Sequence, residues 1–193
     1  FDQYDVYMDL NPDLPTGDEK AEKVQGMFDR IAPRYDFVNR IMTFRLDVRW
    51  RKQTVQALEL EKDSLVIDLA CGTGDFCCEL ENAGMVPLGF DFSMGMLQAG
   101  RSASPLCQSD VLRLPIRDAS VDGATCGFAL RNLTELEPFF AEVNRVLKVG
   151  GRIGFLDVAE PENRILNWGH HIYFDRIVPK VGALLSDKSA YSY

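Results

Sequence analysis

Residues 65–75, Leu-Val-Ile-Asp-Leu-Ala-Cys-Gly-Thr-Gly-Asp, constrain the fold of this chain more than any other segment. The β-forming residues run directly into a Gly-x-Gly turn at Gly72 and Gly74, where missing Cβ atoms let a ligand approach the backbone. A second apolar run, residues 85–90, ends at Asp91. In a parallel α/β sheet such strand ends face a shared crevice, and an acid at the second tip can bind ribose hydroxyls. These features predict a site for a nucleoside-containing cofactor.

The glycine pattern also bears on which cofactor the turn favours. A dinucleotide site usually reads Gly-x-Gly-x-x-Gly, with the pyrophosphate at the N-terminus of the following helix. Here Gly74 is followed by Asp75-Phe-Cys-Cys, so the third glycine is absent and Asp75 places a negative charge where a pyrophosphate would lie. The pattern disfavours a nicotinamide-dependent oxidoreductase and favours a cationic ligand. An ordinary strand–helix turn that binds nothing is the remaining alternative.

Composition narrows the class of protein. The chain has 193 residues, 46% of them hydrophobic, which is enough for one domain with a substantial core. A net charge of −8 and a pI of about 4.8 argue against a nucleic-acid partner, because phosphate contacts favour a basic face. No apolar run approaches the roughly 18 residues of a membrane span, and no signal-peptide pattern is present. We therefore expect a cytoplasmic protein.

The cysteines predict buried free thiols rather than a metal or disulfide site. None forms a Cys-x-x-Cys pair, the odd count fits a reducing compartment, and His170 and His171 lie far away in the sequence. In or beside strands, free cysteine behaves as a small apolar residue. We therefore expect no metal ion at Cys71, Cys77, Cys78, Cys107 or Cys126.

Hydrophobic periodicity and turn residues predict the order of helices and strands. Residues 18–42 favour a helix with a break at Ala32-Pro33, and residues 47–58 favour a second helix. The apolar stripe of this second helix is Trp50, Thr54, Ala57 and Leu58. Strands are then expected over 65–70, 86–90, 106–109, 121–128 and 152–158, and helices over 75–82, 93–99 and 138–147. This alternation predicts an α/β fold with a parallel sheet covered by helices on both faces.

Several residues mark the ends of these elements. Gly84 is placed as a C-terminal cap of the helix over 75–82, and Pro138 lies where a first-turn proline is tolerated. The segment Lys148-Val-Gly-Gly151 is expected to close the helix over 138–147. That helix should bury one face, made of Phe139, Phe140, Val143 and Leu147.

We expect one main domain. Residues 1–18 are predicted to be a loose N-terminal leader, and residues 19–193 a single domain. Within it, residues 19–60 form a helical substrate cap, residues 64–158 the cofactor-binding core, and residues 159–193 a helix or lid on the substrate side. Because the chain starts at Phe1 and its last residues resemble the middle of a sequence, we expect truncation at both ends.

Six segments, in this order, resemble the ubiquinone/menaquinone biosynthesis C-methyltransferase family. They are Phe28-Asp-x-Ile-Ala-x-x-Tyr-Asp-x-x-Asn39, Asp-Leu-Ala-Cys-Gly-Thr-Gly-Asp75, Asp91-Phe-Ser-x-x-Met96, Gly127-Phe-Ala-Leu-Arg-Asn132, Arg145-Val-Leu-Lys-x-Gly-Gly151 and Tyr173-Phe-x-x-x-x-Pro179. The second one also resembles motif I of class I S-adenosylmethionine-dependent methyltransferases. The resemblance implies their Rossmann-like three-layer sandwich, with an N-terminal helical extension and S-adenosylmethionine as cofactor. The last two strands of the family's sheet are expected to be missing.

The family resemblance also implies roles for particular residues. Thr73 and the backbone of Gly72 and Gly74 would hold the methionine moiety, and Asp91 would bind the ribose hydroxyls. Asp110 and the Val111 amide would recognise adenine. The remaining cofactor-side candidates are Asp68, at the start of motif I, and Gly127, where relatives often carry a serine that this chain lacks.

The reaction implied by the resemblance is methylation of a ring carbon of a prenylated quinol, with 2-demethylmenaquinol favoured. Deprotonation of an adjacent hydroxyl makes that carbon nucleophilic. We expect Arg131 and Asn132 to orient and stabilise the phenolate, because arginine is too basic to accept the proton itself. A salt bridge to a nearby acid is the alternative role of Arg131. Tyr35, Asn39 and Tyr173 are candidates to close over the ring.

The predicted partners follow from this lipid substrate. They are a prenylated quinol, a membrane surface touched from the inner face without insertion, and a second copy of the chain, with no nucleic acid. The loop of residues 43–50 departs from many relatives at Arg45, Asp47 and Val48, so it either changes substrate preference or simply caps the next helix. Other functions left open are another small-molecule methyltransferase and a non-catalytic cofactor-binding scaffold of a quinone-synthesis assembly.

Overall fold

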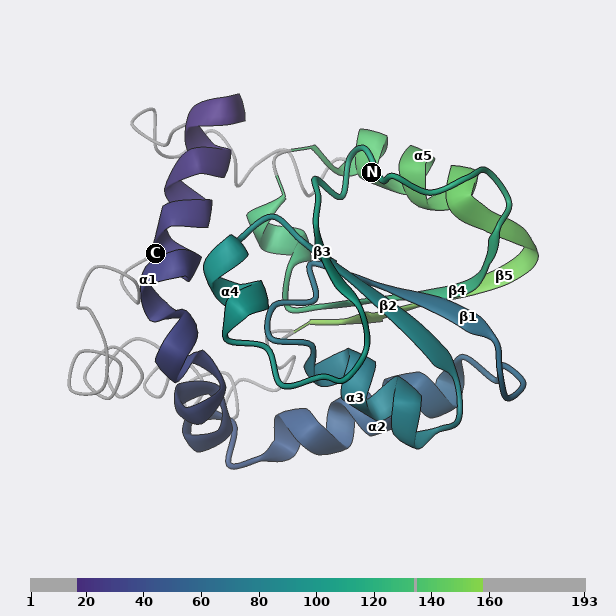
Figure 1. Ribbon diagram of the computed structural model, residues 1–193, viewed down its shortest axis with the longest axis horizontal. Coiled ribbons are helices and arrows are strands. Elements are labelled where there is room, and N and C mark those ends of the chain that lie inside the picture. Colours follow the sequence, from purple (N-terminus) through teal and green to yellow (C-terminus); the bar gives the residue numbers. More distant parts are fainter. Residues whose placement is uncertain (1–16, 134, 158–193) are drawn as a thin grey trace, which may run out of the picture.

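The structure is a computed structural model that describes residues 17–133 and 135–157 (Figure 1). Residues 1–16 of the predicted leader, the predicted lid over 159–193 and the candidate Tyr173 lie outside these residues, whereas residues 17 and 18 belong to the first helix. So do His170 and His171.

Within the described residues the sheet has five parallel strands, at the positions where strands were predicted. They are β1 (Leu65–Leu69), β2 (Val86–Asp91), β3 (Leu106–Gln108), β4 (Val121–Gly127) and β5 (Leu147–Leu156). The strand order is β3-β2-β1-β4-β5, so the chain leaves β1 toward one edge and returns to its other side with β4. The strand order reverses between β1 and β4, and ligands of open α/β sheets bind at such a reversal.

Helices complete the three layers. Figure 1 shows α2 (Leu46–Ala57) and α3 (Asp75–Asn82) on one face of the sheet and α5 (Leu136–Val146) on the other. The long α1 (Gly17–Met42) and the short α4 (Met94–Gln98) lie together beyond the carboxyl ends of the strands. A 3₁₀ turn at Leu130–Asn132 follows β4. The predicted helical extension therefore covers the strand ends where a ligand is expected.

Two apolar clusters hold the layers together. One, between the sheet and α5, centres on the buried Ile67, Phe90 and Phe139. The other, between the sheet and the helices α2 and α3, includes Val66 and Phe76. The strand β1 contributes to both clusters because both of its faces are buried, as expected for a central parallel strand.

The predicted helix break at Ala32-Pro33 is wrong, because α1 runs through Pro33 to Met42. An internal proline removes one backbone hydrogen bond and costs about 3 kcal/mol. The helix is anchored on the N-terminal side of Pro33, where Ile31 and Ala32 are buried and Asp29 accepts hydrogen bonds from Ser93 and Gly95. These contacts outweigh the missing bond.

The predicted apolar stripe of the second helix is right only in part. Leu58, directly after α2, is buried as expected, but Ala57 is exposed. The helix itself buries Asp47, Arg51 and Val55. The two charged residues are inside because they pair with each other, Arg51 Nη1 lying 2.7 Å from Asp47 Oδ2. Asp47 does not cap the helix, since Arg45 occupies the N-cap position.

The glycines after α5 form part of β5 rather than a helix-closing turn. The helix ends at Val146, and β5 begins at Leu147. The strand pairing shifts register between Val121 and Gly123, and the bulged residues include Gly150, whose φ is +82°. The predicted buried face of α5 is right for Phe139 and Val143, but Phe140 is 45% exposed.

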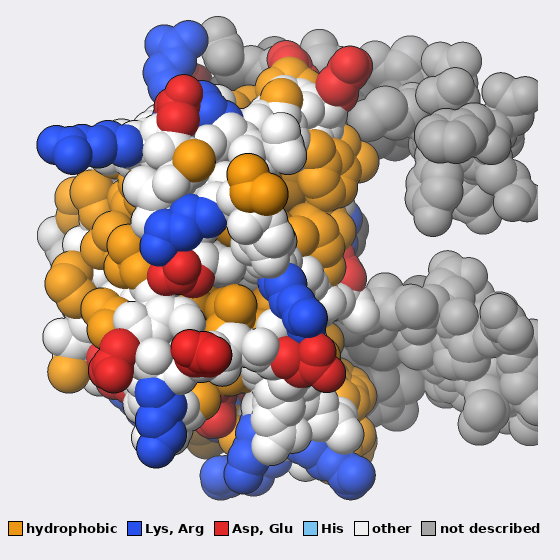
Figure 2. Space-filling model, turned by 90° about the vertical axis from the view of Figure 1, so that its right-hand side faces the viewer, with side chains coloured by type: hydrophobic (Ala, Val, Ile, Leu, Met, Phe, Trp, Pro, Cys, Tyr) orange, Lys and Arg blue, Asp and Glu red, His pale blue; other side chains and the backbone are white. Residues whose placement is uncertain are grey.

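Figure 2 shows the side of the molecule opposite α1, where acidic and basic side chains are interspersed. Ion pairs near the starts of β4 and β5 include Lys148–Asp122 and Arg145–Asp118. Exposed pairs of this kind contribute little to stability. Within the ranges 17–133 and 135–157, no helix combines the length and hydropathy of a membrane span.

Candidate active site

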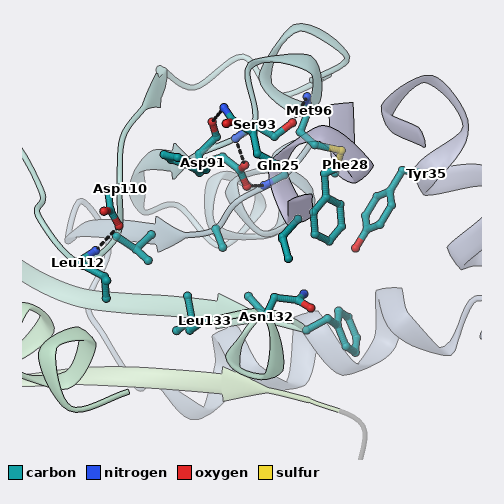
Figure 3. A pocket seen from close by; sticks show the side chains of 18 of the residues that line it. Gln25, Phe28, Tyr35, Asp91, Ser93, Met96, Asp110, Leu112, Asn132 and Leu133 are labelled. Atoms are coloured by element: carbon teal, nitrogen blue, oxygen red, sulfur yellow. Dashed lines mark hydrogen bonds between the residues drawn. The ribbon is translucent and has the colours of Figure 1, made fainter. Parts of the chain in front are cut away.

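A cavity of about 230 Å³ lies at the carboxyl ends of β1, β2 and β4, with α1 along one side. It brings together seven of the residues singled out in the sequence, namely Tyr35, Gly72, Asp91, Asp110, Val111, Gly127 and Asn132. Figure 3 shows Asp110 and Leu112 at one end and Phe28 and Tyr35 at the other, with Asn132 facing Asp91 across the space. The cavity is therefore long, with different chemistry at its two ends.

The turn after β1 brings bare backbone to the cavity wall. Gly72 has a φ of +57°, and a Cβ there would lie 3.0 Å from Met96 Cε. Two non-glycine residues that line the cavity share this left-handed conformation, Ala70 at +53° and Phe128 at +57°. Such conformations are costly for residues with a Cβ and concentrate at functional sites. Here they lie at the tips of the two strands between which the sheet order reverses.

Asp91 is held rigidly at the tip of β2. Its Oδ2 accepts a hydrogen bond from the Gly72 N–H at 2.7 Å, and its Oδ1 accepts one from the Ser93 N–H at 2.8 Å. Burial raises the pKa of Asp91, while these backbone donors act in the opposite direction. A carboxylate oxygen can accept more than one hydrogen bond, so Asp91 retains capacity for hydroxyl donors of a ligand.

The loop after β3 forms the Asp110 end of the cavity. Asp110 is exposed, and its Oδ1 accepts a hydrogen bond from the Leu112 N–H at 2.9 Å. Val111 is buried, and together with Leu112 and Phe92 it gives this end an apolar lining. A flat heterocycle with polar edges suits such a combination.

The other end of the cavity is aromatic. Phe28 and Tyr35 of α1 pack edge to face, with ring centroids 5.9 Å apart. Burial raises the pKa of Tyr35, so its hydroxyl keeps its proton at neutral pH. Asn39, one turn further along α1, is hydrogen-bonded to Tyr35 but is not part of the cavity lining.

Of the two residues expected to act on the phenolate, only Asn132 lines the cavity. Arg131 is not among the lining residues and has a side chain that is 59% exposed. Arg131 Nη2 lies 3.8 Å from Asp157 Oδ1. The ion pair considered as the alternative role of Arg131 is thus formed in this structure.

The remaining motif I residues are held by other parts of the chain. Thr73 Oγ1 donates a hydrogen bond to Asp36 Oδ1 at 2.7 Å, which fastens the turn to α1. Gly74 is the N-cap of α3, with a φ of +84°. Asp68 lies inside the sheet, where it accepts a hydrogen bond from Thr125 Oγ1 at 2.8 Å. Burial raises the pKa of Asp68 to about 7.

Gly127 leaves no room for a side chain. A Cβ at this position would lie 2.6 Å from Cε2 of Phe76, whose ring packs from the first turn of α3. With Phe76 in this position, a serine at position 127 would not fit. The two residues lie 51 positions apart in the sequence, so neither local segment could reveal this steric conflict.

Sequence reasoning missed a buried charge network beneath the cavity. Asp75 Oδ1 pairs with Arg40 at 3.1 Å, and its Oδ2 pairs with Arg51 at 3.2 Å. Although burial opposes ionisation of Asp47, hydrogen bonds from Thr43 and Arg51 lower its pKa. From the sequence, the charge of Asp75 was expected to be available to a cationic ligand. In the structure this carboxylate is paired with two arginines of the chain itself.

All five cysteines lie among the described residues and are free thiols. Cys71, Cys77 and Cys126 are buried, but Cys107 is exposed on the short edge strand β3, which differs from the prediction. Burial raises the pKa of the three buried thiols, so they remain protonated. In the part of the chain that the structure describes, no three acidic, histidine or cysteine side chains gather as metal ligands.

Comparisons with known proteins agree with this geometry. Residues 16–193 match the ubiE/COQ5 methyltransferase family. A demethylmenaquinone methyltransferase from Roseiflexus castenholzii is 42% identical in an alignment that covers 93% of this chain and 79% of that protein. A ubiquinone/menaquinone biosynthesis C-methyltransferase UbiE from Geotalea uraniireducens is 35% identical over 91% of this chain and 80% of its own length.

A solved structure shows the same fold. The crystal structure of a SAM-dependent methyltransferase from Aquifex aeolicus has a TM-score of 0.53 and 17% identity, covering 65% of this chain and 77% of that one. At this identity the likeness concerns the fold alone. It agrees with the class I methyltransferase sandwich expected from motif I.

Proposed function

The chain belongs to the ubiE/COQ5 methyltransferase family, and on this premise we propose that it methylates a ring carbon of a prenylated quinol. The methyl donor is S-adenosylmethionine. The favoured acceptor is 2-demethylmenaquinol, the substrate class named for the Roseiflexus relative. The observation that carries the proposal is the cavity at the sheet reversal, which joins a ribose-type carboxylate, an apolar end and an aromatic end.

The residues present fit S-adenosylmethionine. Gly72 has no side chain, so its backbone is open to a ligand in the cavity. A Cβ at this position would also press on Met96. Asp91 is oriented by two backbone donors and faces the same space. At the Asp110 end of the cavity, the Asp110 carboxylate and the Val111 backbone can bond the polar edge of adenine. The apolar walls of this end can pack against the faces of the ring.

We assign roles on this basis. Asp91 holds the ribose hydroxyls, and Asp110 with the Val111 N–H reads the adenine edge. The turn from Gly72 to Gly74 holds the methionine moiety, with Thr73 contributing through its backbone since its hydroxyl is bonded to Asp36. Asp68 ties the end of β1 to β4 through its bond with Thr125. Gly127 supplies the close backbone wall on the β4 side.

The acceptor ring is assigned to the end of the cavity lined by Phe28, Tyr35 and Asn132. The cofactor supplies an activated methyl group on a good leaving group, so the protein's main tasks are alignment and exclusion of water. The Asn132 amide and the protonated Tyr35 hydroxyl are donors suited to a phenolate oxygen. Arg131 adds positive charge from the rim. Tyr173 and Asn39 remain proposals for closing over the ring.

The decisive assay measures methyl transfer by the complete protein to 2-demethylmenaquinol under reducing conditions. The products are separated and their masses are measured by mass spectrometry. We expect a product heavier by one CH₂ unit. Asn132→Ala should lower kcat about 10²–10³-fold, the range for removing one donor to a developing oxyanion. Arg117→Gln, at an exposed position outside the cavity lining, should leave kcat unchanged.

Other outcomes separate the competing functions. Methylation of polar phenols or amines but never of the quinol would make the protein a different small-molecule methyltransferase. Cofactor binding without any turnover would make it a scaffold.

We also propose that the protein meets its lipid substrate at a membrane surface, from the cytoplasmic side, and that it acts there without insertion. The exposed apolar Phe37 and Ile41 on α1 and Leu46 on α2, near the exposed Arg45 and Arg49, support this. Sedimentation with anionic and neutral vesicles tests it, and equal sedimentation with both would refute the charge contribution. We also propose a homodimer, which a molar mass of twice that of the chain in light scattering would support.

A further inference from the structure

Arg51 lies at the meeting point of three elements. The residue is 7% exposed and belongs to the buried face of α2. Nη1 lies 2.7 Å from Asp47 Oδ2 on the same helix and 3.2 Å from Asp75 Oδ2 at the start of α3. The Cζ atom lies 5.7 Å from the centroid of the Phe128 ring, just after β4. One side chain therefore touches the cofactor turn after β1 and the loop after β4.

These contacts sit at the ends of the two segments that wall the cavity. Asp75 directly follows Gly74 of the Gly-x-Gly turn, and Phe128 directly follows Gly127. Phe128 lines the cavity and has a φ of +57°, so its backbone needs contacts that hold it in this conformation. The two walls follow β1 and β4, which are paired neighbours in the sheet up to Leu69 and Cys126.

We propose that Arg51 is a positioning residue that couples the turn after β1 to the loop after β4 and so keeps the cavity walls at the spacing that S-adenosylmethionine needs. The part about the cofactor rests on the proposed function. The coupling itself does not, because it concerns contacts within this chain.

The chemistry of arginine suits this task. A planar guanidinium can pair with carboxylates along its edge while its face lies against an aromatic ring, and a lysine ammonium offers no such plane. A buried ion pair adds little net stability, since desolvation of both charges offsets their attraction. Stability alone therefore gives little reason to bury Arg51 with Asp47 and Asp75. Fixing the positions of three elements gives a better one.

The test is amide hydrogen exchange of the complete protein, without ligand, comparing the parent with Arg51→Lys. Lysine keeps the positive charge for the two carboxylates but loses the planar contact with Phe128. We expect faster exchange in peptides covering both 70–78 and 127–133, by about 2- to 30-fold, the range for mutations that modulate coupling. The Kd for S-adenosylmethionine, measured by calorimetry, should rise by a similar factor.

Arg145→Lys is the matched control. Arg145 also pairs with two acids, Glu142 and Asp118, but it does so on α5, away from the cavity. Its replacement by lysine should speed exchange locally and leave both cavity segments as in the parent. If Arg51→Lys merely speeds exchange throughout the domain, or only in α2, the coupling proposal is overturned.

A second variant decides the matter even if Arg51→Lys does not fold. Phe128→Leu removes the ring contact and keeps both ion pairs, so under the proposal it also speeds exchange in 70–78, across the cavity. In the double variant Arg51→Lys/Phe128→Leu, amide exchange in 70–78 should be no faster than in the faster of the two single variants. If the two rate increases multiply instead, the coupling is contradicted. Should the parent protein fail to bind S-adenosylmethionine, the proposed function falls, and ligand-free exchange still decides the role of Arg51.

Discussion

Gly127 and Phe76 offer a quantitative test of the packing at the tip of β4. A Cβ on Gly127 would lie 2.6 Å from Phe76 Cε2 and 3.1 Å from its Cδ2, whereas carbon atoms pack best at about 3.5–4.0 Å. Phe76 is 4% exposed and belongs to the cluster beneath the sheet, so its ring cannot move without disturbing its neighbours. We therefore expect Gly127→Ser to lower the free energy of unfolding by about 1–3 kcal/mol, the usual cost of overpacking.

The double variant distinguishes this steric cause from others. Phe76→Leu alone should cost about 1–2 kcal/mol through lost apolar burial. Combined with Gly127→Ser it makes room for the new side chain. The free-energy cost of the double variant should therefore be smaller than the sum of the two single costs by at least about 1 kcal/mol. Urea unfolding followed by circular dichroism measures all four proteins. Gly26→Ala, in α1 with no close contact at its Cβ position, is the control and should be neutral or stabilising.

Additivity of the two substitutions within about 0.5 kcal/mol would refute the reasoning. The same double variant places a hydroxyl on the β4 wall of the cavity. If that serine contacts the cofactor, as in relatives that carry it, the double variant should bind S-adenosylmethionine at least as tightly as the parent.

Two further predictions concern stability. The pKa of Asp68 is raised to about 7 from an ordinary value of 3.8, so the folded state binds the proton more tightly than the unfolded state. Its stabilising contribution is complete below the unfolded pKa and is lost as pH rises toward 7, by up to about 1.4 kcal/mol per pH unit. Asp68→Asn should flatten this slope in unfolding curves from pH 5 to 8, and an unchanged slope would show that Asp68 is ionised throughout. Ser93 caps α4 by accepting from the Met96 N–H and donates to Asp29, so Ser93→Ala should cost about 1–2 kcal/mol in urea unfolding. Ser120→Ala, whose hydroxyl bonds only a loop carbonyl, should stay within about 0.5 kcal/mol, and equal losses for both serines would contradict the capping role.

Local signals in the sequence were enough to place most of the sheet and its crossover helices. The helix over 75–82 is found with the predicted bounds because Gly74 and Gly84 mark both of its ends. The apolar runs before Gly72 and Asp91 became neighbouring strands, so their tips met at one cavity as expected. Such features depend on residues close together in the chain.

Features that depend on distant partners escaped prediction. From the sequence, Asp47 was weighed only as a substrate-loop residue or a helix cap, whereas in the structure it pairs with the buried Arg51, which also reaches Asp75. Pro33 is tolerated within α1 because of contacts made by Asp29 with α4. For Arg131 the sequence allowed a salt bridge but could not name its partner, which is Asp157, directly after β5. In each case tertiary contacts overrode the local preference.

The most direct test of the account is calorimetric titration of S-adenosylmethionine into the complete protein and its Asp91→Ala variant. The account predicts binding to the parent, and a loss of about 1.5–3 kcal/mol in the variant, the range for hydrogen bonds to a charged group. Asp122→Ala is the matched control, since Asp122 also accepts a backbone N–H but lies at the start of β4, away from the cavity. Equal affinity of the Asp91 variant and the parent would contradict the central claim.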